Sequence, residues 1–133
     1  MNLATQITIV AAGGALGALG RTGLTALVAQ IESTAALSGT ILGTMVVNLV
    51  GCFAMGGARA AVEIGGWGST QMQAFLFSGL LGAFTTFSTF EADTLTLWRD
   101  GQYLAATTYM SVSVAGGVVA FLVGWTLLSS WMN

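Results

Sequence analysis

The sequence has few charged residues and contains no lysine, histidine or proline. Of its 133 residues, 3 are basic and 5 are acidic, whereas 55% are hydrophobic. A soluble domain usually carries charge on about a quarter of its residues, because its surface must be hydrated. The composition therefore excludes a soluble domain and indicates an integral membrane protein.

The missing residue types exclude further classes. A net charge of −2 without a basic cluster argues against nucleic acid as a partner, and against docking to anionic lipid through a polybasic patch. Without histidine, and with Cys52 as the single thiol, the chain lacks ligands for a zinc or iron–sulfur site and cannot form an internal disulfide. The sequence also contains no nucleophile–base pair that would indicate an enzyme.

Four apolar runs account for nearly the whole chain. A bilayer core requires about 20 apolar residues per helix, and suitable runs lie at approximately 5–29, 40–62, 71–97 and 103–131. The first run is too long for a signal peptide and has no basic region before it, so we interpret it as a retained span. The sequence predicts an all-α membrane protein whose single domain, 1–133, has four antiparallel transmembrane helices.

The positive charges give almost no orientation bias. An excess of Lys and Arg in cytoplasmic loops normally sets topology, but Arg59 and Arg99 lie at joints on opposite faces and Arg21 lies within the first span. Such a chain can insert both ways, and opposed copies can pair about a two-fold axis in the membrane plane. The alternative is that one charge or the N-terminal amine still fixes a single orientation.

The third run is unusually polar. It has hydroxyls at positions 85, 86, 88 and 89, followed by Glu91 and Asp93. Such groups are costly in hydrocarbon unless they are satisfied, and hydroxyls that bond to the preceding turn bend helices. Because Gly79 and Gly82 weaken the helix further, we predict a break near 82–86. The carbonyls freed by a break can hold a cation.

Phenylalanines recur every three residues in this run, at Phe84, Phe87 and Phe90. The edge of an aromatic ring is positive, so rings that face a pore can favour an anion without binding it too tightly to leave. The alternative is that these rings face lipid or a packed core.

Polar residues also interrupt the second and fourth runs. Asn48 lies among apolar neighbours and either hydrogen-bonds across helices or coordinates an anion. Thr44, one turn earlier, and the pair Tyr109 and Ser113 can extend a polar track, or can form helix–helix bonds. Arg21 either pairs with Glu32 or Asp93, or attracts anions into a vestibule. Donors dominate this set, which favours an anion over a cation as the transported species.

Three motifs follow one another along nearly the whole chain: Gly13-Gly14-x-x-Gly17-Ala18-x-x-Arg21, Gly43-Thr44-x-x-x-Asn48-x-x-Gly51-x-Phe53-x-x-Gly56 and Gly79-x-x-Gly82-x-x-Thr85-Thr86-Phe87-Ser88-Thr89-Phe90. Together they resemble the Fluc/CrcB fluoride-channel family. The resemblance implies a channel that exports fluoride passively across the cell (inner) membrane, with two pores in a dual-topology, antiparallel homodimer.

The resemblance also implies roles for single positions. Residues matching Phe87, Phe90 and Asn48 line the pore, and a structural sodium ion at the dimer interface binds carbonyls matching Gly82 and Thr85. The implied polar track comprises Thr44, Ser88, Asp93, Tyr109 and Ser113, and the implied vestibule contains Arg21. A second glycine often follows the one at 82, but this chain has Ala83, which we expect to keep a right-handed conformation.

Two other functions compete with this one. A small multidrug-type, proton-coupled exporter has the same size but requires a carboxylate in its first span, where this chain has Arg21. A non-transporting scaffold would explain the small residues spaced four apart, which let helices approach closely. It would not explain the Thr-Thr-Phe-Ser-Thr-Phe run.

Overall fold

The computed structural model describes residues 2–31 and 38–132, a region that is almost entirely helical and contains no strand. Three helices are long and apolar enough to cross a membrane: α1 (Leu3–Ile31), α2 (Gly39–Glu63) and α6 (Tyr103–Met132). The remaining pass, third in chain order, consists of α3 (Thr70–Gln73), the π-helix η1 (Ala74–Leu81), α4 (Gly82–Phe84) and α5 (Phe87–Arg99). The predicted all-α class, with four helical passes and a broken third one, is confirmed.

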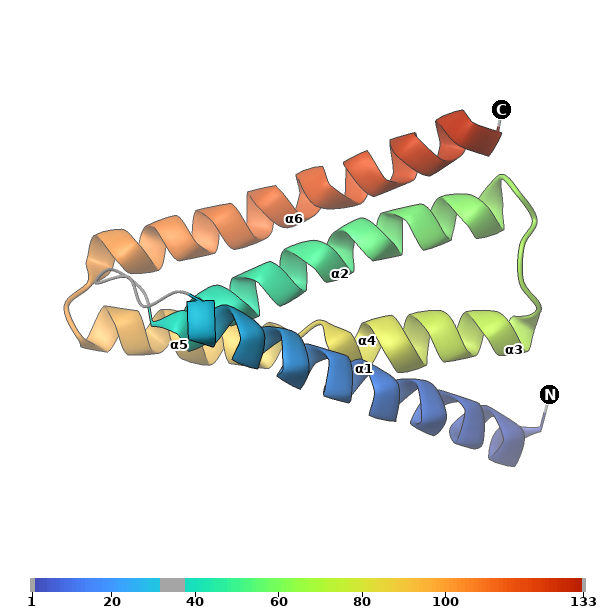
Figure 1. Cartoon of the computed structure of the whole chain (residues 1–133), viewed down its shortest axis with the longest axis horizontal. Coiled ribbons are helices and arrows are strands. Elements are labelled where there is room, and N and C mark those ends of the chain that lie inside the picture. Colours follow the sequence, from blue (N-terminus) through green and yellow to red (C-terminus); the bar gives the residue numbers. More distant parts are fainter. Residues whose placement is uncertain (1, 32–37, 133) are drawn as a thin grey trace.

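The four passes lie side by side, and both ends of the chain emerge at the same end of the bundle (Figure 1). Helix α6 packs along α2, and α1 packs against η1 and α4. Glycines permit the first contact: a Cβ on Gly56 would collide with the carbonyl of Phe121, and a Cβ on Gly124 with that of Phe53. Close backbone packing of this kind holds helices together in lipid, where the hydrophobic effect does not.

The third pass breaks at Thr85 and Thr86, within the predicted segment. Both residues are extended, with φ/ψ of −78°/154° and −146°/114°. Ala83 precedes the break within α4, and no non-glycine residue in the described ranges has a positive φ. The expected right-handed conformation of Ala83 is confirmed. The break therefore does not depend on a left-handed residue.

The surface of the bundle is that of a membrane protein. Large apolar side chains such as Leu16, Leu104 and Val118 are exposed along its length. Exposed aromatic residues lie at both ends: Trp67 and Trp131 at one, Trp98 and Tyr103 at the other. Tryptophan and tyrosine prefer the headgroup region, where an apolar ring and a polar tip are both accommodated. The chain is thus a membrane protein with several apolar helices.

Candidate functional site

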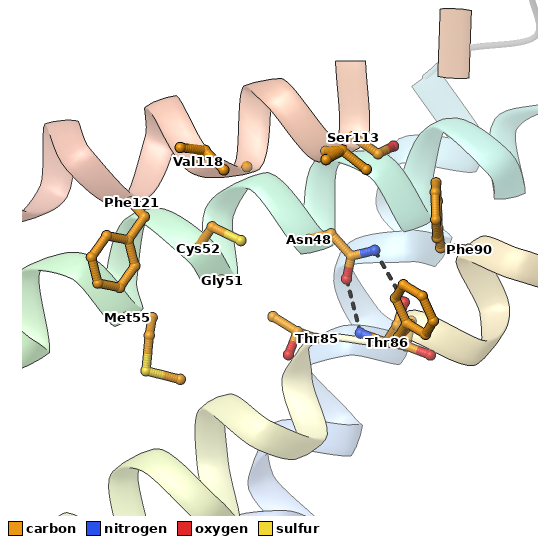
Figure 2. A pocket seen from close by; sticks show the side chains of 13 residues that line it. Asn48, Gly51, Cys52, Met55, Thr85, Thr86, Phe90, Ser113, Val118 and Phe121 are labelled. Carbon is orange, nitrogen blue, oxygen red and sulfur yellow. Dashed lines mark hydrogen bonds between the residues drawn. The ribbon is translucent and has the colours of Figure 1, made fainter. Parts of the chain in front are cut away.

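Asn48 on α2 reaches across to the break in the third pass. Its Oδ1 accepts a hydrogen bond from the backbone N–H of Thr86 at 2.8 Å, and its Nδ2 donates to the Thr86 carbonyl at 3.1 Å. Figure 2 shows both bonds between the two helices. The prediction that Asn48 makes a cross-helix hydrogen bond is confirmed, and the partner is main chain rather than side chain.

Thr86 is the residue around which the break is built. It is 9% exposed, and a helix that ends here leaves its N–H and carbonyl without intrahelical partners. Asn48 supplies both partners. The Thr86 Oγ1 accepts from the Thr89 N–H at 3.3 Å and donates to the Thr89 hydroxyl at 2.9 Å, which caps α5. These hydrogen bonds matter because each buried polar group left without a partner costs about 1–3 kcal/mol of folding free energy.

The Asn48 side chain also lines an open groove of about 460 Å³, called here the Asn48 groove. Its wall includes Thr85 and Thr86 from the break, Phe87 and Phe90 from α5, and side chains of α2 and α6. The lining is Asn48, Gly51, Cys52, Met55, Thr85, Thr86, Phe87, Phe90, Ser113, Val114, Gly117, Val118 and Phe121. It is a mostly apolar surface with a few hydrogen-bonding groups.

Ser113 is the unsatisfied member of this groove. Its Oγ is buried and has no hydrogen-bond partner among the described residues. Hydroxyls elsewhere in the helices donate to the carbonyl four residues earlier, as Ser111 does at 2.8 Å and Thr94 at 2.8 Å. Ser113 lies on the same helix as Ser111 but does not make this bond. Its Oγ is therefore an unsatisfied polar atom in the wall of the groove.

The two phenylalanines differ in their surroundings. Phe90 is 8% exposed and its ring packs 5.4 Å from that of Tyr109, whereas Phe87 is 73% exposed. The two phenylalanine rings are 5.7 Å apart and tilted by 44°. Phe90 thus lines the groove and also belongs to a small buried cluster with Tyr109 and Leu97. Phe87 projects from the chain beside the break.

A second groove, of about 360 Å³, lies on the other side of the break and is called here the Arg21 groove. Threonines are the commonest residues of its wall, which consists of Arg21, Thr22, Thr25, Ala26, Ala29, Thr40, Thr44, Thr86 and Thr89. No carboxylate in the described ranges lies within 4.0 Å of a basic group of Arg21; the one ion pair found there joins Arg59 to Glu63 at 3.9 Å. Pairing of Arg21 with Asp93 is thus wrong, and Glu32 lies outside the described residues.

The predicted polar track is divided between different places. Thr44 lines the Arg21 groove, and its hydroxyl donates to the Thr40 carbonyl at 3.2 Å. Tyr109 donates to Asp93 at 3.2 Å, and neither residue lines a groove described above. Ser88 is exposed on α5. Among the residues that the structure describes, Thr86 alone lines both grooves, so the helix break is the wall that they share.

The break also presents oxygen ligands. The carbonyls of Gly82, Ala83, Phe84 and Thr85 accept no hydrogen bond found among the described residues. Nowhere in the described part of the chain do three His, Cys, Asp or Glu side chains form a cluster that could hold a metal. Carbonyl oxygens are ligands for a hard cation. The residues present therefore fit a cation bound by main-chain oxygens, including those of Gly82 and Thr85.

Sequence reasoning missed the role of Thr86. Its position in the polar run was noted, but its main-chain pairing with Asn48 leaves no sequence pattern. The spacing of Thr86 and Thr89 was the one available signal, because Ser or Thr at an N-cap bonds to the amide three residues later. That spacing would have located the start of α5.

Comparison with known proteins assigns the family. Residues 8–125 match the model described as "CrcB-like protein, Camphor Resistance (CrcB)". A Paracoccus denitrificans protein named "Fluoride-specific ion channel FluC" is 40% identical over 118 residues, covering 89% of this chain and 90% of its own. A Methylobacillus flagellatus protein of the same name is 35% identical over 138 residues, covering 96% and 98% of the two chains. The chain belongs to the CrcB family.

Proposed function

We propose that this chain forms a fluoride-selective ion channel that exports fluoride passively from the cytoplasm. The observation that carries the proposal is the Asn48 groove, in which the phenylalanines of the motif, the Asn48 amide and the unpartnered Ser113 hydroxyl line one surface. Family membership supports the ion, because the similar proteins are named as fluoride-specific ion channels. That name denotes a channel and not an enzyme.

The groove offers donors of the strength that a permeating anion needs. The Nδ2 of Asn48 has two hydrogens and gives one to Thr86, so one remains. The Ser113 hydroxyl adds a second donor, and the edges of Phe87 and Phe90 add weak positive potential. Together they replace part of the hydration shell of a small anion without a full positive charge, so that the ion binds and still leaves. Arg21, in its groove of threonines, attracts anions toward the break.

The openness of this surface supports the proposal of an antiparallel homodimer. Phe87 is 73% exposed beside the break, and the Asn48 groove is open along the bundle rather than closed into a tube. A single chain therefore provides one wall of a pore, and a second copy would close it. The balanced arginines support opposed insertion, and a two-fold axis in the membrane would then give two equivalent pores.

A structural sodium ion at the dimer interface is part of the proposal. The chain lacks an acidic cluster for a metal within its described residues, but the carbonyls of Gly82 and Thr85 are free to coordinate one. Sodium bound there would offset the cost of carbonyl groups left unpaired by the break. We place the assembly in the cell (inner) membrane, where it would dissipate fluoride that enters as neutral acid and dissociates inside.

Ion efflux from liposomes tests the function. Vesicles that contain the purified protein and equal concentrations of potassium fluoride and potassium chloride are diluted into a buffer with neither anion. Valinomycin is added so that potassium leaves with the anions, and both anions are followed with electrodes. Fluoride should leave far faster than chloride, and faster than from empty vesicles. Fluoride release at the rate of empty vesicles would contradict the proposal.

The position of the C-terminus tests dual topology. A protease-cleavable tag after residue 133 should be cut partly from outside and partly from inside sealed, right-side-out vesicles if the chain inserts both ways. Cleavage from a single side would refute opposed insertion, while leaving the efflux result to decide the function.

A further inference from the structure

The hydrogen bonds between Asn48 and Thr86 determine how the break is oriented. The Thr86 N–H belongs to the peptide group joining residues 85 and 86, and no peptide in the described ranges is cis. In a trans peptide the N–H and C=O point in opposite directions. Because the Thr86 N–H points at Asn48 Oδ1, the Thr85 carbonyl points away from Asn48 and away from α2.

The same reasoning applies to the next peptide group. The Thr86 carbonyl points at Asn48 Nδ2, so the Phe87 N–H is directed away from it. Both peptide planes flanking Thr86 are thereby fixed by one side chain. The Thr85 carbonyl, which accepts no hydrogen bond found in the described part of the chain, is held on the side of the break opposite to α2.

We propose that Asn48 is a positioning residue for a cation at the break, because its amide holds both main-chain groups of Thr86 and so aims the Thr85 carbonyl at the ion. This inference rests on the proposed function and extends it. Asn48 would serve both faces of the break, with one bond pair orienting the cation ligand and the remaining Nδ2 hydrogen facing the groove. A change at Asn48 should therefore alter how the protein responds to sodium.

The Asn48→Asp substitution isolates one of the two bonds. It keeps the shape of the side chain and the oxygen that accepts from Thr86 N–H, but an ionised carboxylate cannot donate to the Thr86 carbonyl and repels it. The peptide group between residues 85 and 86 then keeps its hydrogen bond to residue 48, whereas the peptide group between residues 86 and 87 loses its own. Gln71→Glu makes the same amide-to-carboxylate change at an exposed residue in α3, at the end of the bundle, and is the matched control.

Thermal unfolding of the purified, full-length protein in detergent, in sodium chloride or in N-methylglucamine chloride, measures the cation response without any flux. Sodium should raise the unfolding temperature of the wild type and of Gln71→Glu with the same half-effective concentration. In Asn48→Asp that concentration should rise by about tenfold, equivalent to about 1.4 kcal/mol. An unchanged half-effective concentration in Asn48→Asp, or no sodium response in the wild type, would overturn the inference.

Two further measurements keep the test decisive. Fluoride efflux from the same wild-type preparation tests the channel function separately. If no fluoride leaves the vesicles, the proposed function is contradicted, but the effect of sodium on the unfolding temperature still stands. If Asn48→Asp does not fold, amide exchange in the wild type decides instead. The Thr86 amide should exchange much more slowly than the neighbouring Phe87 amide, and equal rates for the two would refute the clamp.

Discussion

Replacing Ser113 with alanine should separate a ligand for the permeating ion from a residue that stabilises the fold. The Ser113 hydroxyl is buried in the Asn48 groove and bonds to no group among the described residues. Its removal therefore costs no protein hydrogen bond, and it relieves the desolvation of an unpaired group. We expect the thermal stability of Ser113→Ala to be unchanged or slightly higher.

Ser113→Ala should, by contrast, greatly reduce fluoride transport. A hydrogen bond to a charged partner is worth about 1.5–3 kcal/mol, so loss of this donor along the path should slow fluoride efflux by about ten- to one-hundredfold. Chloride leak should not change. The assay is efflux from liposomes at equal protein density, with thermal unfolding of the same preparations.

Ser111→Ala is the matched control for this substitution. It removes the same hydroxyl two residues earlier on α6, where the side chain is exposed and donates to the carbonyl of Thr107. Fluoride efflux through Ser111→Ala should match the wild type. If the two variants conduct fluoride equally, the Ser113 hydroxyl is not a ligand of the ion, and its lack of a hydrogen-bond partner has no role in transport.

Four further substitutions, with Gly23→Ala as a control, test other parts of the structure. Phe87→Ile and Phe90→Ile should each slow fluoride efflux by about two- to tenfold through loss of a ring edge, and only the buried Phe90 change should lower thermal stability; wild-type flux in both would assign the rings to packing alone. Gly124→Val should destabilise the protein by about 1–3 kcal/mol in chemical unfolding, because its side chain meets backbone of α2. Gly23→Ala should not, because no atom of the described residues lies within 4 Å of the added Cβ. Arg21→Gln should slow fluoride efflux at low ionic strength and reduce its salt dependence; a salt dependence equal to that of the wild type would remove Arg21 from the entry path.

The helices and the break were predictable because each depends on local chemistry. Apolar runs of membrane length specify helices, and Thr85 and Thr86 after Gly82 weaken the third one at the observed place. The π-helix before the break was not predicted. Its residues, Ala74–Leu81, are an ordinary apolar segment, and a wider turn leaves little trace in a hydrophobic pattern.

The composition of the site was less predictable than its location. Thr44 and Asn48 are one turn apart and were expected to share a track, but residues four apart on a helix differ by about 40° in direction. In the structure the two residues line separate grooves, and Thr86 lines both. The pairing of Asn48 with main chain depends on tertiary structure, so no local pattern could predict it.

The reversal potential of the wild-type protein in a planar bilayer is the most direct measurement of a passive, fluoride-selective pathway. With fluoride on both sides at a tenfold gradient and chloride at an opposite gradient, the current should reverse near the fluoride equilibrium potential, about 59 mV per tenfold gradient, and should not shift with a pH difference. Reversal at the chloride potential, reversal that follows the pH gradient, or no current at all would contradict the channel described here.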